Sequence, residues 1–179
     1  MTNMETLYAI KEFFEKTIKS KNLDSRTENY YVNSSSRNNY IFNSKIEGLE
    51  ETDLIILIGT NPRYEATILN ARIRKAHIIN NVDIFSIGDV GDLTYPYDYL
   101  DGDIENIKKI TENNHEVSNL IKNAKKPLII IGQSSLKNKS AKYIFESVKS
   151  FLKSNDKISN EWNSLNIISE NASAVGNFD

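Results

Sequence analysis

Three short hydrophobic segments, each followed by a glycine, constrain the fold of this chain more than any other feature. They are LIILI at residues 54–58, VDIFSI at residues 82–87 and LIII at residues 128–131, followed by Gly59, Gly88 and Gly132. Short runs of this kind, with few or no polar residues, are typical of strands that are buried on both faces of a parallel sheet. Residues 165–168 (LNII) have the same character, and we expect them to form a further strand.

The segments between these runs carry apolar residues at the spacings of three and four that are typical of helices. Residues 62–76 and 104–123 are each expected to form a helix, and Ser134 and Ser135 are expected to cap another that reaches Leu152. Alternating strands and helices of this size indicate an α/β fold, with a parallel sheet and helices on both of its faces. The expected architecture is a three-layer one of the Rossmann-like kind.

A chain of 179 residues suits one domain, and it is long enough to bury a sizeable core. We expect a helix over residues 1–22, a loop over residues 23–45 and the α/β core over residues 46–179. The loop is rich in Asn and Ser, but it also contains Tyr30 and Tyr31. Two adjacent tyrosines in a polar stretch indicate that part of the loop packs against the rest of the protein.

The composition excludes several kinds of site. The chain contains no cysteine, which rules out disulfides, thiolate zinc sites and iron–sulfur clusters held by its own cysteines. It has only two histidines, His77 and His115, and a formal net charge of −2, which gives no electrostatic argument for nucleic acid. No run of about 18 apolar residues occurs that would predict a membrane span.

The turn from Gly59 to Arg63 is the first candidate ligand site. It follows a predicted buried strand and precedes a helix, and open α/β sheets bind ligands at such turns, with phosphates against the helix N-terminus. Arg63 could add a charge for a phosphate. The alternative, which we favour, is that Asn61 and Pro62 simply start the helix. The chain has no G-x-G-x-x-G or Walker motif that would support nucleotide binding.

Basic residues cluster on the helix that follows this turn. Arg72, Arg74, Lys75 and His77 could bind an anion or an acidic partner, although a solvated helix face with ion pairs is the commoner meaning of such a pattern. His115 comes close to a predicted helix start, and we interpret it as a surface residue.

The segment from Asp92 to Asp101 combines acidic and aromatic residues in a way that is less common. Its aspartates and tyrosines could coordinate a hard cation, but no ligand spacing is fixed, and we expect the tyrosines to serve packing or a protein interface. Ser134 and Ser135 follow a strand without a G-x-S-x-G motif, so they do not predict a nucleophile. From the residues alone we therefore predict no catalytic, cofactor-binding or metal-binding residue.

Particular phrases of the sequence resemble one family. They are GTNPRYE at residues 59–65, NARIRK at residues 70–75, DLTY at residues 92–95, AKKP at residues 124–127, GQSS at residues 132–135 and WNSLNI at residues 162–167. The chain resembles, over nearly its whole length, the large iron–sulfur subunit of NADH:quinone oxidoreductase (the 75-kDa-type subunit of respiratory complex I).

The resemblance implies a role inside a proton-translocating enzyme for a chain that is itself non-catalytic. In that family the cysteine motifs for the clusters lie in an N-terminal region, whereas the C-terminal region is like a molybdopterin oxidoreductase and has lost the pterin and the metal. The chain corresponds to the middle of that C-terminal region. It begins with its own Met1 and stops at Asp179, so we expect a split or shortened subunit.

The expected function follows from the same resemblance. The chain would be a structural, cofactor-free fragment that supports electron transfer from NADH to quinone, with iron–sulfur clusters and FMN in other subunits. Its partners would be other peripheral-arm subunits, above all the cluster-bearing N-terminal part of the same subunit, with no nucleic acid and no direct membrane insertion. The expected location is the matrix side of the mitochondrial inner membrane, or the cytoplasmic side of the membrane in a bacterium.

Two alternatives from other classes remain open. In a fragment of an active molybdopterin enzyme, such as a formate dehydrogenase, residues 61–63 would contact the phosphates of the cofactor. A stand-alone α/β protein that binds nucleotides is the other. The sequence leaves open which subunits the chain contacts, whether its gene is organellar, whether the segment from Asp92 to Asp101 is an interface, and where the rest of the family domain is encoded.

Overall fold

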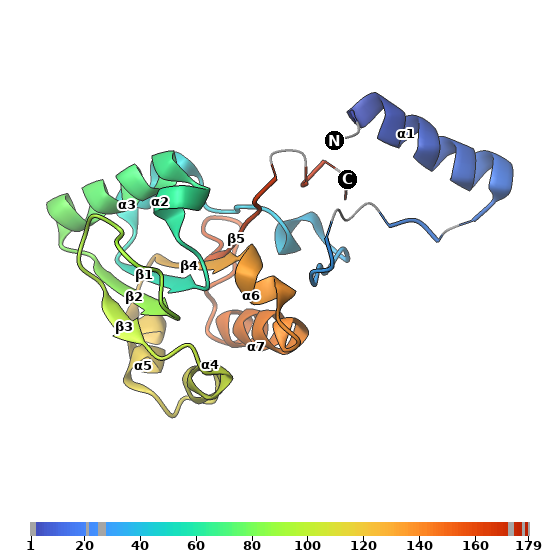
Figure 1. Cartoon of the computed structure of the whole chain (residues 1–179). Coiled ribbons are helices and arrows are strands. Elements are labelled where there is room, and N and C mark those ends of the chain that lie inside the picture. Colours follow the sequence, from blue (N-terminus) through green and yellow to red (C-terminus); the bar gives the residue numbers. More distant parts are fainter. Residues whose placement is uncertain (1–2, 21, 25–27, 172–173, 177, 179) are drawn as a thin grey trace.

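A five-stranded parallel sheet forms the centre of the molecule (Figure 1). The computed structural model describes the chain apart from residues 1–2, 21, 25–27, 172–173, 177 and 179. The strands are β1 (Leu54–Ile58), β2 (Asp83–Ile87), β3 (Asp98–Leu100), β4 (Pro127–Gly132) and β5 (Leu165–Ile168). All neighbouring strands are parallel, which confirms the predicted sheet. The sequence pattern did not predict β3, which is short and whose first two residues are exposed.

The strand order is β3-β2-β1-β4-β5, so β1 lies in the middle and the chain continues outward from it in both directions. After β1 the chain adds β2 and β3 on one side, and it then returns to place β4 and β5 on the other. The point at which the direction reverses therefore lies between β1 and β4. In open sheets of this kind, ligands bind at the carboxyl ends of the strands that flank the reversal.

Helices cover both faces of the sheet, as predicted (Figure 1). One face carries α2 (Pro62–Glu65), α3 (Thr67–Asn80) and the 3₁₀ helix η3 (Ile46–Glu51). The other face carries α4 (Ile104–Thr111), α5 (Glu116–Asn123), α6 (Gln133–Lys137) and α7 (Ala141–Ser154). The N-terminal helix α1 (Met4–Glu12) continues into a π-helical turn (η1, Phe13–Ile18), and neither has a buried residue.

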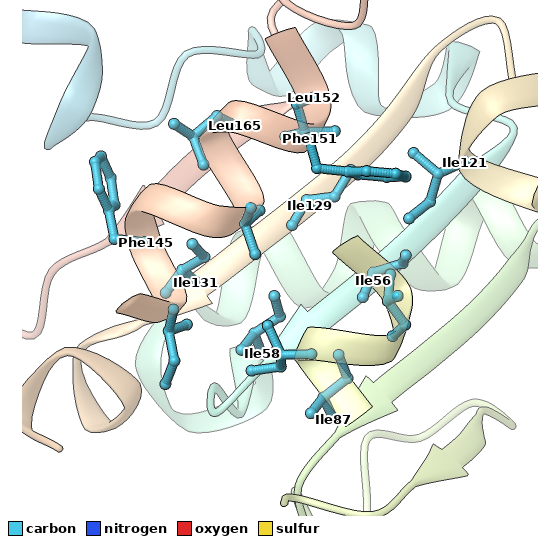
Figure 2. Packing of buried hydrophobic residues seen from close by; sticks show 14 of the residues in the cluster. Ile56, Ile58, Ile87, Ile121, Ile129, Ile131, Phe145, Phe151, Leu152 and Leu165 are labelled. Carbon is cyan, nitrogen blue, oxygen red and sulfur yellow. The ribbon is translucent and has the colours of Figure 1, made fainter. Parts of the chain in front are cut away.

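Each face of the sheet has its own hydrophobic core. Isoleucines of β1 and β4 point alternately to the two sides, so that Ile129 and Ile131 belong to the core under α7, whereas Leu128 and Ile130 belong to the core under α3. Figure 2 shows the first of these cores, in which Phe145 and other residues of α7 lie against the strands. Both central strands are buried along their whole length, which explains why their sequences lack polar residues.

Three predicted helices are interrupted. The helix expected from residue 62 breaks at Ala66, whose φ of −153° is not helical. The helix expected over residues 104–123 breaks at Asn113, which has a φ of 66° and separates α4 from α5. Ser134 and Ser135 do not cap the long helix α7, because they lie inside the separate short helix α6, which begins at Gln133. The first helix ends at Lys19, which adopts the left-handed conformation.

The loop before the core packs on the body of the protein, as Tyr30 and Tyr31 predicted. Tyr30 is buried, and Tyr31 contacts Phe145 with 5.8 Å between the ring centroids. The Tyr31 hydroxyl donates a hydrogen bond of 2.7 Å to Glu146 on α7, and the Asn33 amide donates another of 2.7 Å to the same carboxylate. Glu146 therefore fixes this segment to α7.

Acid should loosen this attachment. The hydrogen bond from Tyr31 lowers the pKa of Glu146 below its ordinary value, so the carboxylate stabilises the fold above the unfolded-state pKa of about 4.3. That contribution is lost as the pH falls through the lower pKa of the folded state. We expect Glu146→Gln to reduce the loss of stability between about pH 5 and pH 3, measured by urea unfolding at a series of pH values. The exposed Glu161→Gln is the control, and an equal change in both variants would contradict the assignment.

Candidate functional site

The carboxyl ends of β1 and β4 form the candidate site, because the strand order reverses between them. The β1 end leads into the turn of residues 59–61 and helix α2, and the β4 end leads directly into α6. The structure thus brings the predicted turn from Gly59 to Arg63 next to Ser134 and Ser135, which lie more than 70 residues later in the chain.

Three hydrogen-bond donors of the first turn are already occupied. Asn61 caps α2 by accepting a bond of 3.0 Å from the Arg63 backbone, and Pro62 takes the first helical position, as predicted. Glu65 folds back, and its two carboxylate oxygens accept 2.8 Å bonds from the Thr60 hydroxyl and from the Asn61 backbone N–H. An internal carboxylate therefore takes the place at which this turn would bind an anion.

Arg63 is directed toward the next loop of the sheet edge. Its guanidinium forms an ion pair with Asp92, and the Asn61 side chain donates to the Val90 carbonyl. The backbone N–H of Thr94, and then Arg63, lower the pKa of Asp92 below its ordinary value. The arginine that we considered for a phosphate thus joins the turn after β1 to the turn after β2.

Close backbone contact fills the space between β1 and β4. A Cβ atom placed on Gly132 would lie 2.3 Å from the Gly59 carbonyl oxygen and 2.6 Å from the Thr60 Cβ. A Cβ atom on Gly59 would lie 2.0 Å from the Ser135 hydroxyl, and Ser134 donates a hydrogen bond to the Gly59 carbonyl. The two turns therefore touch without any space for a ligand between them.

Two cavities of about 20 Å³ each occur elsewhere among the described residues. One lies between the 30–40 segment and α6, and the other lies in the isoleucine core of Figure 2. Neither is lined by the turn after β1. A cavity of about 20 Å³ holds about one water molecule, whereas ligand pockets measure about 300–1,000 Å³.

The tyrosines of the segment from Asp92 to Asp101 have three different environments. Tyr95 is buried and donates a 2.8 Å hydrogen bond to Asn70 of α3, which itself donates to the Leu93 carbonyl at 3.2 Å. Tyr97 donates a 3.0 Å bond to the Gly91 carbonyl, and Tyr99 in β3 is 56% exposed. Tyr95 thus serves packing, and Tyr99 is available at the surface. Among the described residues, no group of three or more acidic or histidine side chains is arranged to hold a metal ion.

Half of the basic cluster on α3 is engaged in ion pairs of the predicted kind. Arg72 and Lys75 both contact Glu50 of η3, at 2.5 Å and 2.9 Å. The His77 ring nitrogen Nδ1 lies 2.9 Å from the Val82 carbonyl, near the end of the helix. Arg74 is exposed.

Outside this cluster, His115 caps α5, because its Nδ1 accepts from the Val117 backbone at 3.2 Å.

Asn166 on β5 is a structural residue that the sequence pattern did not predict. It is fully buried, and its side-chain oxygen accepts 2.8 Å bonds from the backbone N–H groups of Asn43 and Ser44. These bonds attach residues 43 and 44, which come before the α/β core, to the edge strand β5. This edge of the sheet is therefore covered. The only sequence signal was an asparagine inside an otherwise apolar run, which marks a buried polar group that needs a partner.

Glu65→Ala should test the internal cap. The substitution leaves the buried Thr60 hydroxyl and the Asn61 N–H without their acceptor, so we expect a loss of about 1–3 kcal/mol in the free energy of unfolding. Urea unfolding measures it, and Glu161→Ala, at an exposed glutamate, should stay within about 0.5 kcal/mol of the wild type. If both variants were equally stable, Glu65 would not be the cap of this turn.

No helix in the described part of the chain is long and apolar enough to cross a membrane.

Comparison with known proteins agrees with the resemblance found in the sequence. The family model for molybdopterin oxidoreductases matches residues 1–179. The chain is 36% identical over 191 aligned residues to the NADH-ubiquinone oxidoreductase 75 kDa subunit of Reclinomonas americana, an alignment that covers 100% of this chain and 28% of that protein. It is 32% identical to the mitochondrial NADH dehydrogenase [ubiquinone] iron-sulfur protein 1 of Solanum tuberosum, over 100% of this chain and 24% of the relative.

A fungal relative gives the same result. The mitochondrial NADH-ubiquinone oxidoreductase 78 kDa subunit of Neurospora crassa is 39% identical over 145 residues, which cover 80% of this chain and 19% of the relative. The chain thus spans about a quarter or less of the length of these relatives. It belongs to the molybdopterin oxidoreductase family, and its sequence is similar to one section of the 75-kDa-type subunit of complex I.

Proposed function

We propose that the chain is a structural, cofactor-free part of the large peripheral-arm subunit of respiratory complex I. In this role it supports electron transfer from NADH to ubiquinone, which other polypeptides carry out with their own FMN and iron–sulfur clusters. It works on the matrix side of the mitochondrial inner membrane. Its main partner is the polypeptide that bears the cysteine motifs, because this chain has no cysteine with which to hold a cluster.

The closed edge between β1 and β4 is the observation that carries the cofactor-free role. A cofactor with phosphate groups needs free N–H donors and space at this edge. Here the Glu65 carboxylate accepts from the donors, and Gly59 and Gly132 bring the two turns into contact. The residues at this position therefore do not fit a pterin cofactor.

The same contacts support a scaffolding role. Asn61 and Arg63 join the turn after β1 to the loop after β2, and Ser134 joins it to α6. Three loops that carry ligands in an open α/β enzyme are thereby held to one another. A rigid edge of this kind suits a domain that offers fixed surfaces to its neighbours.

The second candidate function is a fragment of an active molybdopterin enzyme, which the family match favours. In that case residues 61–63 would have to contact phosphates, and both Glu65 and Asp92 would have to turn away. Two negative charges at this edge argue against it.

Purification of the NADH-oxidising assembly from the source organism tests the proposal. We expect a tagged copy of the full chain to co-purify, in stoichiometric amount, with the polypeptide that carries the cysteine motifs. Elemental analysis of the purified chain should show no molybdenum. Absence of the chain from the assembly would contradict the proposal, and stoichiometric molybdenum would establish the second candidate.

Protease protection tests the location. In intact mitochondria, and in mitoplasts whose outer membrane has been opened, the tagged chain should resist added protease. It should become accessible only when detergent dissolves the inner membrane. Digestion in mitoplasts would place the chain outside the matrix.

A further inference from the structure

The outward side of α2 and α3 carries the most exposed large hydrophobic side chains of the α/β body. Four of its side chains are at least 62% exposed: Tyr64 (77%), Ile68 (72%), Ile78 (67%) and Ile79 (62%). We call this surface, together with Arg74, the α3 outer face. It lies away from the sheet, because Leu69, Ile73 and Ala76 occupy the buried stripe of the same helix.

The spacing along the helix divides this face into two apolar ends, because Ile68 lies ten residues before Ile78, about 15 Å away at 1.5 Å per residue. Residues three and four positions apart are neighbours on a helix, so Arg74 lies beside Ile78. For the same reason Lys75 lies beside Ile79, and it separates Ile79 from Ile68. Isoleucine is a weaker helix former than alanine, lysine or glutamate. Three exposed isoleucines thus bring no benefit to the helix itself, and the adjacent pair Ile78 and Ile79 forms the apolar group of this face that suits a contact with another molecule.

The charge of this face indicates the chemistry of that molecule. Arg72 and Lys75 share the single carboxylate of Glu50, and Arg74 is exposed, so positive charge is left unpaired on this face. The whole chain has a net charge of −2, and the α3 outer face is therefore a basic region on an acidic protein. Among the residues that the structure describes, no acidic group pairs with Arg74.

We infer that the α3 outer face docks an apolar segment flanked by carboxylates on another polypeptide of the peripheral arm. This inference rests on the proposed function and names the surface that serves it. Ile78 and Ile79 enter the apolar part of the contact, and Arg74, one helical turn before Ile78, meets a carboxylate at its rim. A charged rim around an apolar centre is the usual anatomy of a specific protein interface.

Two substitutions separate the apolar and the charged part of the contact. Ile78→Asp places a negative charge in the apolar centre, and Arg74→Glu places it at the rim. Their matched controls lie on the opposite face of the sheet: Leu120→Asp on α5, where the leucine is 40% exposed, and Lys109→Glu on α4. All four positions are exposed, so the thermal unfolding midpoint of each purified variant should stay close to that of the wild type.

The measurement is the fraction of tagged full-length chain that is retained in the NADH-oxidising assembly at physiological salt. We expect Ile78→Asp to lower it at least tenfold, Arg74→Glu to lower it several-fold with a weaker dependence on salt, and both controls to be retained like the wild type.

Each other outcome overturns the inference in a recognisable way. If the wild type is retained and the two α3 variants are retained equally well, the chain binds through another surface and the proposed function stands. If the wild type is not retained, the proposed function fails together with this surface. If the purified wild type is a dimer by light scattering and Ile78→Asp makes it monomeric, the occupant of the face is a second copy of the chain.

Discussion

Phe145→Ala is expected to lower the free energy of unfolding by about 3–5 kcal/mol, which is the range for removing a fully buried aromatic side chain. Phe145 is only 1% exposed and belongs to the core under α7 (Figure 2). It also contacts the ring of Tyr31. The substitution therefore removes apolar contacts on both sides and leaves a cavity that a helix held at both of its ends cannot close. Equilibrium unfolding in urea measures the loss.

Tyr143→Ala provides the matched control for this result. Tyr143 is on the same helix, two residues earlier, and is 42% exposed. Both substitutions replace an aromatic residue with the best helix former, so any gain in helix propensity is shared. We expect the control to stay within about 1 kcal/mol of the wild type. A similar loss in both variants would show that the effect does not come from the core under α7.

Burial on both faces explains why the central strands could be predicted. Along β1 and β4 no position faces water, so neither sequence contains a polar residue. The uninterrupted apolar sequence of each strand therefore predicts the strand without knowledge of which helices pack on its two faces. Strand β3 carries no such signal, because its Asp98 and Tyr99 are exposed and only Leu100 contacts the core. Its place in the sheet is set by pairing with β2, which a local pattern does not contain.

The interruptions of the helices depend on backbone conformations that apolar spacing does not reveal. Residues 104–123 keep helical spacing on both sides of Asn113, although its φ of 66° separates two helices. Asparagine tolerates this left-handed conformation better than most residues. His115 then begins the next helix as its cap. An Asn-Asn-His sequence is a recognisable break only when it is weighed against the periodicity around it.

The sequence predicted where the candidate site lies, but it did not predict that a side chain of the protein occupies the hydrogen-bond donors there. The glycine, asparagine and proline of residues 59–62 predicted a turn and a helix start, and the structure has both. A negative charge such as that of Glu65 is favoured near a helix N-terminus, but this holds equally for a side chain that stays in solvent. The structure shows instead that Glu65 returns to the turn and accepts from Thr60 and Asn61.

Gly132→Ala should be among the most destabilising single-methyl changes in the protein. The φ of Gly132 is −84°, which alanine adopts freely, so the expected effect is steric. The added Cβ would lie 2.3 Å from the Gly59 carbonyl oxygen and 2.9 Å from its carbonyl carbon, and both are backbone atoms at the end of the central strand. Neither can move without shifting β1 against β4, and we expect a loss of at least about 1–3 kcal/mol in urea unfolding.

Gly48→Ala is the control, since the nearest atom to its added Cβ is 3.4 Å away on the Trp162 ring and its φ is not positive. It should be neutral, or stabilising by up to about 1 kcal/mol because alanine restricts the unfolded chain. The comparison also bears on function. If Gly132→Ala were as stable as the control, β1 and β4 could separate at their carboxyl ends at little cost. The crevice would then be able to open for a ligand, and the strongest argument for a cofactor-free scaffold would be lost.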